Sequence, residues 1–174
     1  MYREITKCRI CGNKNLKTVL NLGMQKLTGV FPMPDEEVGE GPLELVKCMP
    51  ISGEADVCGL VQLRHSCSGD EMYGENYGYR SGLNASMAEH LNEITTEIQR
   101  RIEIEKDDLV IDIGSNDSTL LRSYHPREAD YLGIDPTGIK FRRYYTEYIE
   151  LVSDFFSAEV VRNVRNGKKA KVIT

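Results

Sequence analysis

Apolar and polar positions follow two alternating patterns along the second half of the chain. From Asp107 onward, short apolar runs bounded by charged residues alternate with stretches of helical spacing. The expected strands are LVIDIG, ADYLGID, YIELVSD and AKVIT, and the expected helices are STLLRSY, TGIKFRRYYTEY and FFSAEVVRNVRN. Strands that alternate with helices at this spacing predict a parallel sheet with right-handed crossover connections.

The first half of the chain has a different pattern. Residues 1–68 hold all five cysteines and four of the six prolines, without a long helical period, which predicts short strands and turns. Residues 84–103 instead form an amphipathic helix whose apolar residues recur every three or four positions, namely Met87, Leu91, Ile94, Ile98 and Ile102. We therefore expect a small domain over 1–68, a helical connector over 69–106 and a sheet-containing domain over 107–174.

The cysteine spacing indicates a metal site. Cys8 and Cys11 are followed by Gly12, so both thiolates can reach one ion and the glycine permits the tight turn around them. A tetrahedral zinc site needs two more ligands, and Cys48 and Cys58 are the best candidates, with Cys67 left over. An odd number of cysteines weakens the alternative of a disulfide framework.

Two other readings of these cysteines remain open. They can be buried and reduced without a metal, or His65 can replace one thiolate in the site. A closed site of four thiolates would be structural, because no position is left for a catalytic water.

The turn after the first expected strand is the candidate cofactor site. Gly114 allows the chain to turn sharply, so that exposed backbone amides at the start of the next helix face a ligand. Asp135 ends the second strand, 23 residues after Asp112, and an acidic group there can accept hydrogen bonds from both ribose hydroxyls of an adenosine. Asn116 and Asp117 place polar and negative groups where a dinucleotide diphosphate would lie.

This arrangement favours a cationic ligand, S-adenosylmethionine (SAM). The turn lacks the three glycines of a dinucleotide site, and Asp112 adds negative charge on the strand below it. The candidate SAM-binding residues are Asp112, Gly114, Asn116, Asp117 and Asp135. The alternatives are a dinucleotide site and an ordinary strand–turn–helix without a ligand.

Composition narrows the class of protein further. The chain has 174 residues, 40% of them hydrophobic, and a net charge of −5. Its basic clusters are short, so the concentrated basic face that nucleic-acid binding requires is not expected. No apolar run is long enough to cross a bilayer, and the N-terminus lacks the core of a signal peptide, which predicts a cytoplasmic protein that does not bind membranes.

Three stretches resemble the SAM-dependent C-methyltransferases of nucleotide-linked 4-keto-deoxysugars. CRICG and CGLVQL are similar to the zinc-binding domain of that family. YGENYGYRSGLNASMAEH is similar to its YxYxS segment, which leads into a helix with a histidine, and IDIGSND with GIDP is similar to its SAM-binding half-fold. The resemblance implies an α/β fold: a small zinc-binding N-terminal domain followed by a truncated Rossmann-like SAM-dependent methyltransferase domain.

The chain departs from the family pattern in three ways. Nine residues separate Cys48 from Cys58, where the family has a compact CxxC, and Ser118 replaces the last glycine of GSNDG, which is expected to narrow the cofactor pocket. Family members also continue into a C-terminal domain that carries much of the sugar-nucleotide site and the histidine expected to be the general base. We therefore expect a fragment, or a chain completed by a partner subunit.

The resemblance implies transfer of a methyl group to C3 of an NDP-4-keto-deoxysugar, with dTDP as the expected nucleotide. On the sugar side the candidates are Tyr77 and Tyr79, since alternate residues of an extended segment point the same way, and His90 on the following helix. The alternatives are tyrosines that pack at a domain junction and a surface histidine. The competing function is a non-catalytic zinc-ribbon binding module with a degenerate SAM-binding half-fold.

Overall fold

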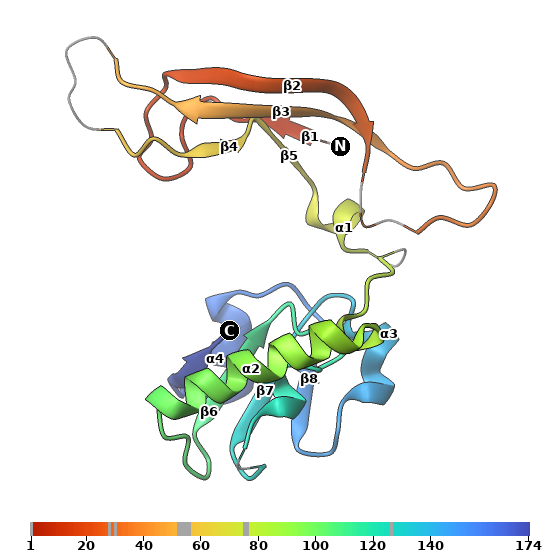
Figure 1. Ribbon diagram of the computed structural model, residues 1–174, viewed down its shortest axis with the longest axis vertical. Coiled ribbons are helices and arrows are strands. Elements are labelled where there is room, and N and C mark those ends of the chain that lie inside the picture. Colours follow the sequence, from red (N-terminus) through yellow and green to blue (C-terminus); the bar gives the residue numbers. More distant parts are fainter. Residues whose placement is uncertain (1, 28, 30, 52–56, 75–76, 126) are drawn as a thin grey trace. The chain divides into compact units, whose positions relative to one another are not determined.

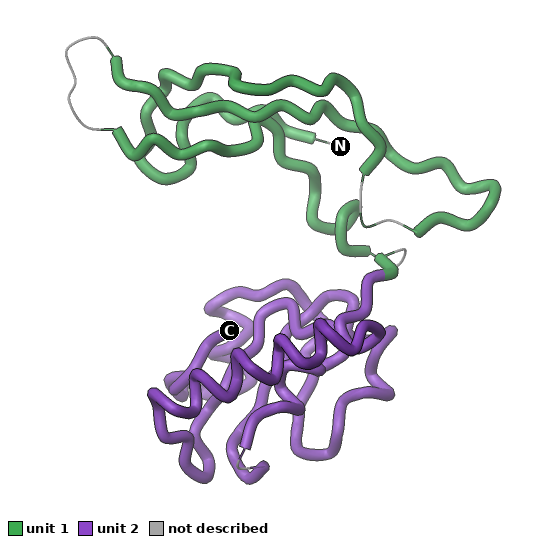
Figure 2. The backbone as a smooth tube through the Cα atoms, viewed as in Figure 1, with its two compact units in different colours: residues 1–78 green, residues 79–174 purple. Residues whose placement is uncertain are grey.

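The chain forms two compact units in the computed structural model, residues 1–78 and 79–174 (Figure 2). The structure describes residues 2–27, 29, 31–51, 57–74, 77–125 and 127–174. The expected connector is shared between the units, because residues 69–78 belong to the first and residues 79–106 to the second.

Unit 1 consists of two small antiparallel sheets and one short helix. Its elements are β1 (Tyr2–Glu4), β2 (Leu16–Lys26), β3 (Glu40–Cys48), β4 (Val61–Leu63), β5 (His65–Cys67) and α1 (Gly69–Met72). One sheet pairs β1 with β5, and the other has the order β2-β3-β4 (Figure 1). Strands were expected here, but β2 and β3 are long. Two register shifts in β2 break its polar–apolar alternation, so the sequence does not show a continuous strand.

Unit 2 is an α/β unit built on a four-stranded parallel sheet. Its elements are η1 (Ser81–Leu83), α2 (Ala85–Arg101), β6 (Leu109–Ile113), η2 (Leu121–Ser123), β7 (Asp130–Ile134), α3 (Gly138–Phe141), η3 (Arg142–Tyr144), β8 (Ile149–Val152), α4 (Ala158–Arg165) and β9 (Ala170–Ile173). The order β8-β7-β6-β9 places the third, second, first and fourth strands side by side. That is the order of the first four strands of a doubly wound sheet, and ligands bind such sheets where the order reverses, here between β6 and β9.

The two faces of this sheet have separate cores. Alternate strand residues such as Val110 and Tyr131 pack on one face with Ile98 of α2, which crosses the sheet in Figure 1. The intervening residues, including Leu109 and Ile111, pack on the other face with α4. Asp112 is an even-numbered residue of β6, so it shares the α2 face with Val110.

Three sequence-based expectations about helices need correction. The helix expected over TGIKFRRYYTEY is only the four-residue α3 followed by the 3₁₀ turn η3. The helix expected over STLLRSY is only the single 3₁₀ turn η2, because Asn116 (φ 47°) and Ser118 (φ 60°) have left-handed backbones that no α-helix accommodates. The expected apolar stripe of α2 also stops early. Ile102 lies just after the last helical residue and is 39% exposed.

Candidate functional site

Four cysteines of unit 1 form the candidate metal centre. The Sγ atoms of Cys8, Cys11, Cys48 and Cys58 all lie within 4.8 Å of one another. The Cys8–Cys58 and Cys11–Cys48 sulfur pairs are 3.5 Å apart, and Cys11–Cys58 is 3.4 Å. In a tetrahedral site with Zn–S bonds of about 2.3 Å, neighbouring sulfurs lie ~3.8 Å apart. The four thiols are therefore arranged as the ligands of one zinc ion.

Two tight turns hold the outer thiols. Gly12 (φ 75°) follows Cys11, and Gly59 (φ 65°) follows Cys58, so both knuckles need a residue that tolerates the left-handed region. Backbone N–H groups of Cys11 and Ile10 point at the Cys8 thiol and lower its pKa to about 6. The first turn thus favours thiolate at Cys8, which is the form that binds a metal. Residues 52–56, in the predicted loop between Cys48 and Cys58, lie outside the described residues.

Two amide side chains support the sulfurs and were not predicted from the sequence. Gln62 donates from Nε2 to Cys8 Sγ at 3.2 Å, and Asn13 donates from Nδ2 to Cys48 Sγ at 3.4 Å. Burial raises the pKa of the Cys48 thiol to about 12, and the Asn13 amide opposes that rise. Gln62 is a buried polar residue in the apolar stretch GLVQL. Its polar side chain in this stretch is the one sequence feature that could have indicated its role beside the sulfurs.

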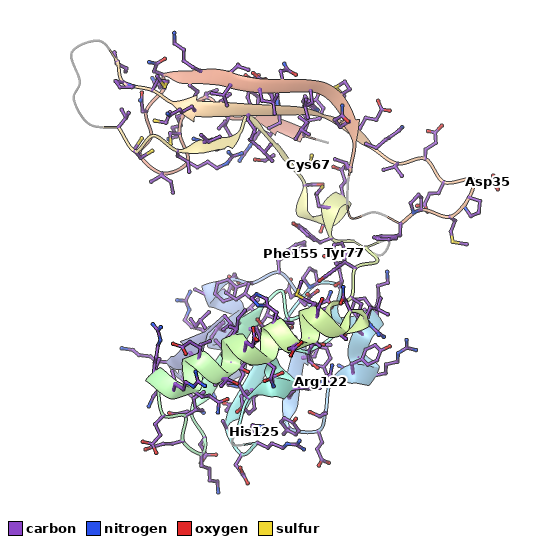
Figure 3. The ribbon with its side chains drawn as sticks, in the orientation of Figure 1. Asp35, Cys67, Tyr77, Arg122, His125 and Phe155 are labelled. Atoms are coloured by element: carbon purple, nitrogen blue, oxygen red, sulfur yellow. The ribbon has the colours of Figure 1, made fainter. Side chains whose placement is uncertain are left out.

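The remaining cysteine and the alternative histidine lie outside this cluster. Cys67 and His65 belong to β5, which pairs with β1, and Cys67 is labelled in Figure 3 where β5 leads to α1. His65 packs edge-on against Tyr2, with ring centroids 5.5 Å apart. The four-thiol arrangement therefore leaves His65 with a packing role.

The turn after β6 is the candidate cofactor site of unit 2. Gly114 (φ 73°) has open space where a side chain would begin. The next residue but one, Asn116, donates its backbone N–H to Asp135 Oδ2 at 2.8 Å. Asp135 Oδ1 accepts from the backbone N–H and the hydroxyl of Thr137, both at 2.6 Å. A carboxylate offers about four acceptor positions, so Asp135 keeps roughly one for a ligand.

The side chains of Asn116 and Asp117 bind the protein's own backbone. Asn116 donates to the carbonyl of Tyr79 at 3.0 Å and accepts from the N–H of Ser81 at 2.9 Å. Asp117 is 1% exposed and accepts from the N–H of Gly82 at 3.0 Å. The sequence predicts both residues as cofactor ligands, and in the structure their side chains also hold residues 79–82 onto the turn.

The sugar-side candidates are distributed over both units. Tyr77, labelled in Figure 3, belongs to unit 1. Its ring lies 5.5 Å from that of Tyr73. Tyr79 belongs to unit 2; it is 44% exposed, and the Asn116 clamp fixes its backbone. The side chain of His90 is 62% exposed on α2 and lies 3.9 Å from Glu93. Glu75 and Asn76, in the predicted tyrosine segment, lie outside the described residues.

Tyr145 and Gly133, which the sequence did not single out, support the turn together with Ser118. The Tyr145 hydroxyl donates to the carbonyl of Asn116 at 2.8 Å and lies 2.8 Å from Ser115 Oγ. Gly133 leaves room for both, since a Cβ there would be 2.5 Å from Ser115 Oγ and 3.0 Å from the Tyr145 ring. Ser118 is buried, and its hydroxyl donates to the carbonyl of Tyr144 at 3.0 Å. A glycine inside the strand YLGID was the one sequence signal of this close approach.

Asp112 is the least satisfied carboxylate of this region. It is 7% exposed, and Thr174 Oγ1 lies 3.2 Å from its Oδ1. The same hydroxyl also lies 3.3 Å from the carbonyl of Ile111, and its single proton can serve only one of the two acceptors. Burial raises the pKa of Asp112 to about 6, and repulsion by Asp135 adds to the rise. An ionised Asp112 therefore favours a cation or a further donor beside it.

Asp112→Asn is expected to stabilise unit 2 near neutral pH. The pKa of Asp112 in the folded unit lies above the ordinary 3.8, so the folded state favours the protonated carboxyl. The free energy of unfolding therefore falls as the pH rises from about 4 to about 6 and the buried carboxyl ionises. A shift of two units corresponds to about 3 kcal/mol, which the variant would recover at pH 7 and not at pH 4. Hydrogen exchange of β6 and β7 peptides across this pH range measures the effect.

The matched control is Asp154→Asn, which alters an exposed carboxyl after β8. Equal protection of parent and Asp112→Asn at pH 7 would contradict the account of Asp112.

Two comparisons with known proteins match parts of this chain. A family model that describes a zinc binding domain, Methyltransf_13, matches residues 8–73. The chain is also 27% identical over 163 residues to the C-methyltransferase NovU of Streptomyces niveus. These matches support a C-methyltransferase family. The alignment covers 92% of this chain but 37% of NovU, so the chain spans less than half of its relative.

The family match and the four-cysteine cluster support a zinc-binding N-terminal domain, and the similarity to NovU supports a methyltransferase-family function. Among the described residues, no helix combines the length and apolar character needed to cross a membrane.

Proposed function

We propose that the chain is part of a SAM-dependent methyltransferase that acts at C3 of a dTDP-linked 4-keto-deoxysugar. The observation that carries this proposal is the Gly114 turn, which follows the first strand of a parallel sheet where the strand order reverses. Similarity to a C-methyltransferase over 92% of the chain supports it.

The charges around the turn suit SAM better than a dinucleotide. Asp112 and Asp135 are both buried near the carboxyl ends of adjacent strands, and Asp112 has at most one donor. A cationic sulfonium compound relieves the repulsion between these carboxylates, whereas a diphosphate adds to it. The backbone of Gly114 can approach a ligand closely because no side chain occupies that space.

The residues of this chain would bind and orient the ligands. When bound, SAM would supply an activated methyl group. Asp135 has one acceptor position left for a ribose hydroxyl, and the exposed phenol of Tyr79 is fixed beside the turn by its clamped backbone. We assign Tyr79 to the sugar side, where a phenol can donate to the oxygen of an enolate at C4. The four-thiol zinc site stabilises unit 1 and offers no open position for chemistry.

The general base is the part of the mechanism that we do not assign to this chain. His90 is exposed on α2, and His125, labelled in Figure 3, is exposed in the loop after η2. We propose that a C-terminal segment or a partner subunit supplies the base that removes the C3 proton.

The proposal predicts that the zinc-loaded chain binds one SAM. Native mass spectrometry with SAM and NAD⁺ in parallel is expected to show a single SAM adduct, which S-adenosylhomocysteine displaces, and no NAD⁺ adduct. Methyl transfer to a dTDP-4-keto-deoxysugar is expected to be absent with this chain alone. A folded, zinc-loaded chain that forms no SAM adduct would instead favour a zinc-binding module with a degenerate half-fold.

A further inference from the structure

Two arginines of unit 2 converge on one tyrosine. The hydroxyl oxygen of Tyr144 accepts hydrogen bonds from Arg80 Nη1 and from Arg143 Nη2, the latter at 2.9 Å. The guanidinium carbons of Arg80 and Arg143 also lie 4.5 and 4.9 Å from the centroid of the Tyr144 ring. Two positive charges therefore meet at a neutral phenol.

The surrounding structure holds this arrangement in place. The carbonyl of Tyr144 accepts from Ser118 Oγ at 3.0 Å, and Ser118 belongs to the turn after β6. Arg80 lies in the clamped segment 79–82, and its side chain is only 20% exposed. Arg80 forms an ion pair with Asp117, with 3.5 Å between Arg80 Nε and Asp117 Oδ2. The cluster is thus built onto the same turn as the proposed cofactor site.

The charges of the cluster do not balance. Within the part of the chain that the structure describes, Asp117 is the one carboxylate that forms an ion pair with either arginine. Two guanidinium groups against one carboxylate leave one positive charge in excess. Each guanidinium has five N–H donors, and a single phenol oxygen uses one donor of each. The remaining donors suit an oxyanion, which arginine binds in a planar, bidentate manner.

We propose that Arg80, Tyr144 and Arg143 form an oxyanion-binding site, with the two guanidinium groups as ligands and the phenol as their spacer. The inference rests on the proposed function only for the identity of the oxyanion. Under that function, two ligands could supply it. One is the carboxylate of SAM, and the other is the diphosphate of the nucleotide-linked sugar.

Arg143→Gln tests the site while leaving the Arg80–Asp117 ion pair in place. Dissociation constants of the zinc-loaded chain are measured by calorimetry for two matched pairs of ligands: SAM with decarboxylated SAM, and dTDP with thymidine. The variant is expected to weaken binding of the oxyanion-bearing member of one pair by about tenfold or more. The member that lacks the oxyanion is expected to bind the variant and the parent equally. Loss confined to SAM identifies the carboxylate, and loss confined to dTDP identifies the diphosphate.

The control is Arg142→Gln, which removes a neighbouring exposed arginine outside the cluster. An equal loss in this control would overturn the proposal, because the effect would then be general attraction by positive charge. Unchanged binding of both SAM and dTDP to Arg143→Gln would also overturn it, as would an equal loss for both members of a pair. If the parent binds neither SAM nor decarboxylated SAM, the proposed cofactor fails, while dTDP still tests the site. A parent that binds neither SAM nor dTDP has no oxyanion site.

Discussion

Cys48→Ser is expected to release the zinc ion and unfold unit 1. The Cys48 sulfur lies 3.5 Å from that of Cys11 at the end of β3, so its loss opens a site that joins β3 to both knuckles. Zinc binding contributes about 10–16 kcal/mol to the folding of small zinc-finger peptides, far more than a unit of this size gains from its core. The zinc content measured by elemental analysis is expected to fall from one zinc per chain to less than about 0.1. The strands β2 and β3 are expected to lose protection from hydrogen exchange.

Cys67→Ser is the matched control, because Cys67 is a free cysteine of the same unit outside the cluster. This variant is expected to keep one zinc and the protection of β2 and β3. Zinc loss from both variants to the same extent would show that Cys67 is also needed, and the four-ligand assignment would then be wrong. Full zinc retention by Cys48→Ser would exclude Cys48 as a ligand.

The metal cluster could be predicted from local spacing only in part. The two-residue gap and the glycine after Cys11 are local features, so the first knuckle is visible in the sequence. Cys48 is not part of a CxxC knuckle. Its backbone N–H donates to the carbonyl of Leu60 beside β4, and this pairing brings Cys48 to the cluster. Asn13 and Gln62 bind sulfurs 35 and 54 residues away, and no local pattern encodes contacts of that range.

The sheet of unit 2 was more predictable than the residues at its edge. Each strand is a short apolar run, and burial on both faces makes such runs stand out. The turn after β6 is different because Asn, Asp, Ser and Thr side chains compete for backbone groups and replace a helix with irregular turns. The Asn116 clamp joins residues 37 positions apart, so the sequence indicated polar chemistry at this site but not its partner.

Asp135→Asn is expected to disrupt the turn and weaken SAM binding by the chain. All three donors that reach Asp135 are fixed: the N–H of Asn116, and the N–H and hydroxyl of Thr137. An asparagine keeps one acceptor oxygen for Thr137 and turns its NH₂ group toward the N–H of Asn116. Two donors then face each other at a buried position, which costs about 1–3 kcal/mol. Since Asn116 also holds residues 79–82, the loss reaches the segment that carries Tyr79.

Calorimetry is expected to show about tenfold to a hundredfold weaker SAM binding to Asp135→Asn, with faster hydrogen exchange of residues 114–118. Asp154→Asn, a carboxyl change after the next strand, is expected to alter neither. Weaker binding with unchanged exchange would mean that Asp135 acts by direct contact with the ligand rather than by shaping the turn. Parent-like affinity would contradict both roles, because Asp135 would then neither bind the ligand nor hold the turn in its binding form. The two measurements therefore separate a carboxylate that binds a ribose from one that holds the turn. The three hydrogen bonds that Asp135 accepts within the protein favour holding the turn as its larger contribution.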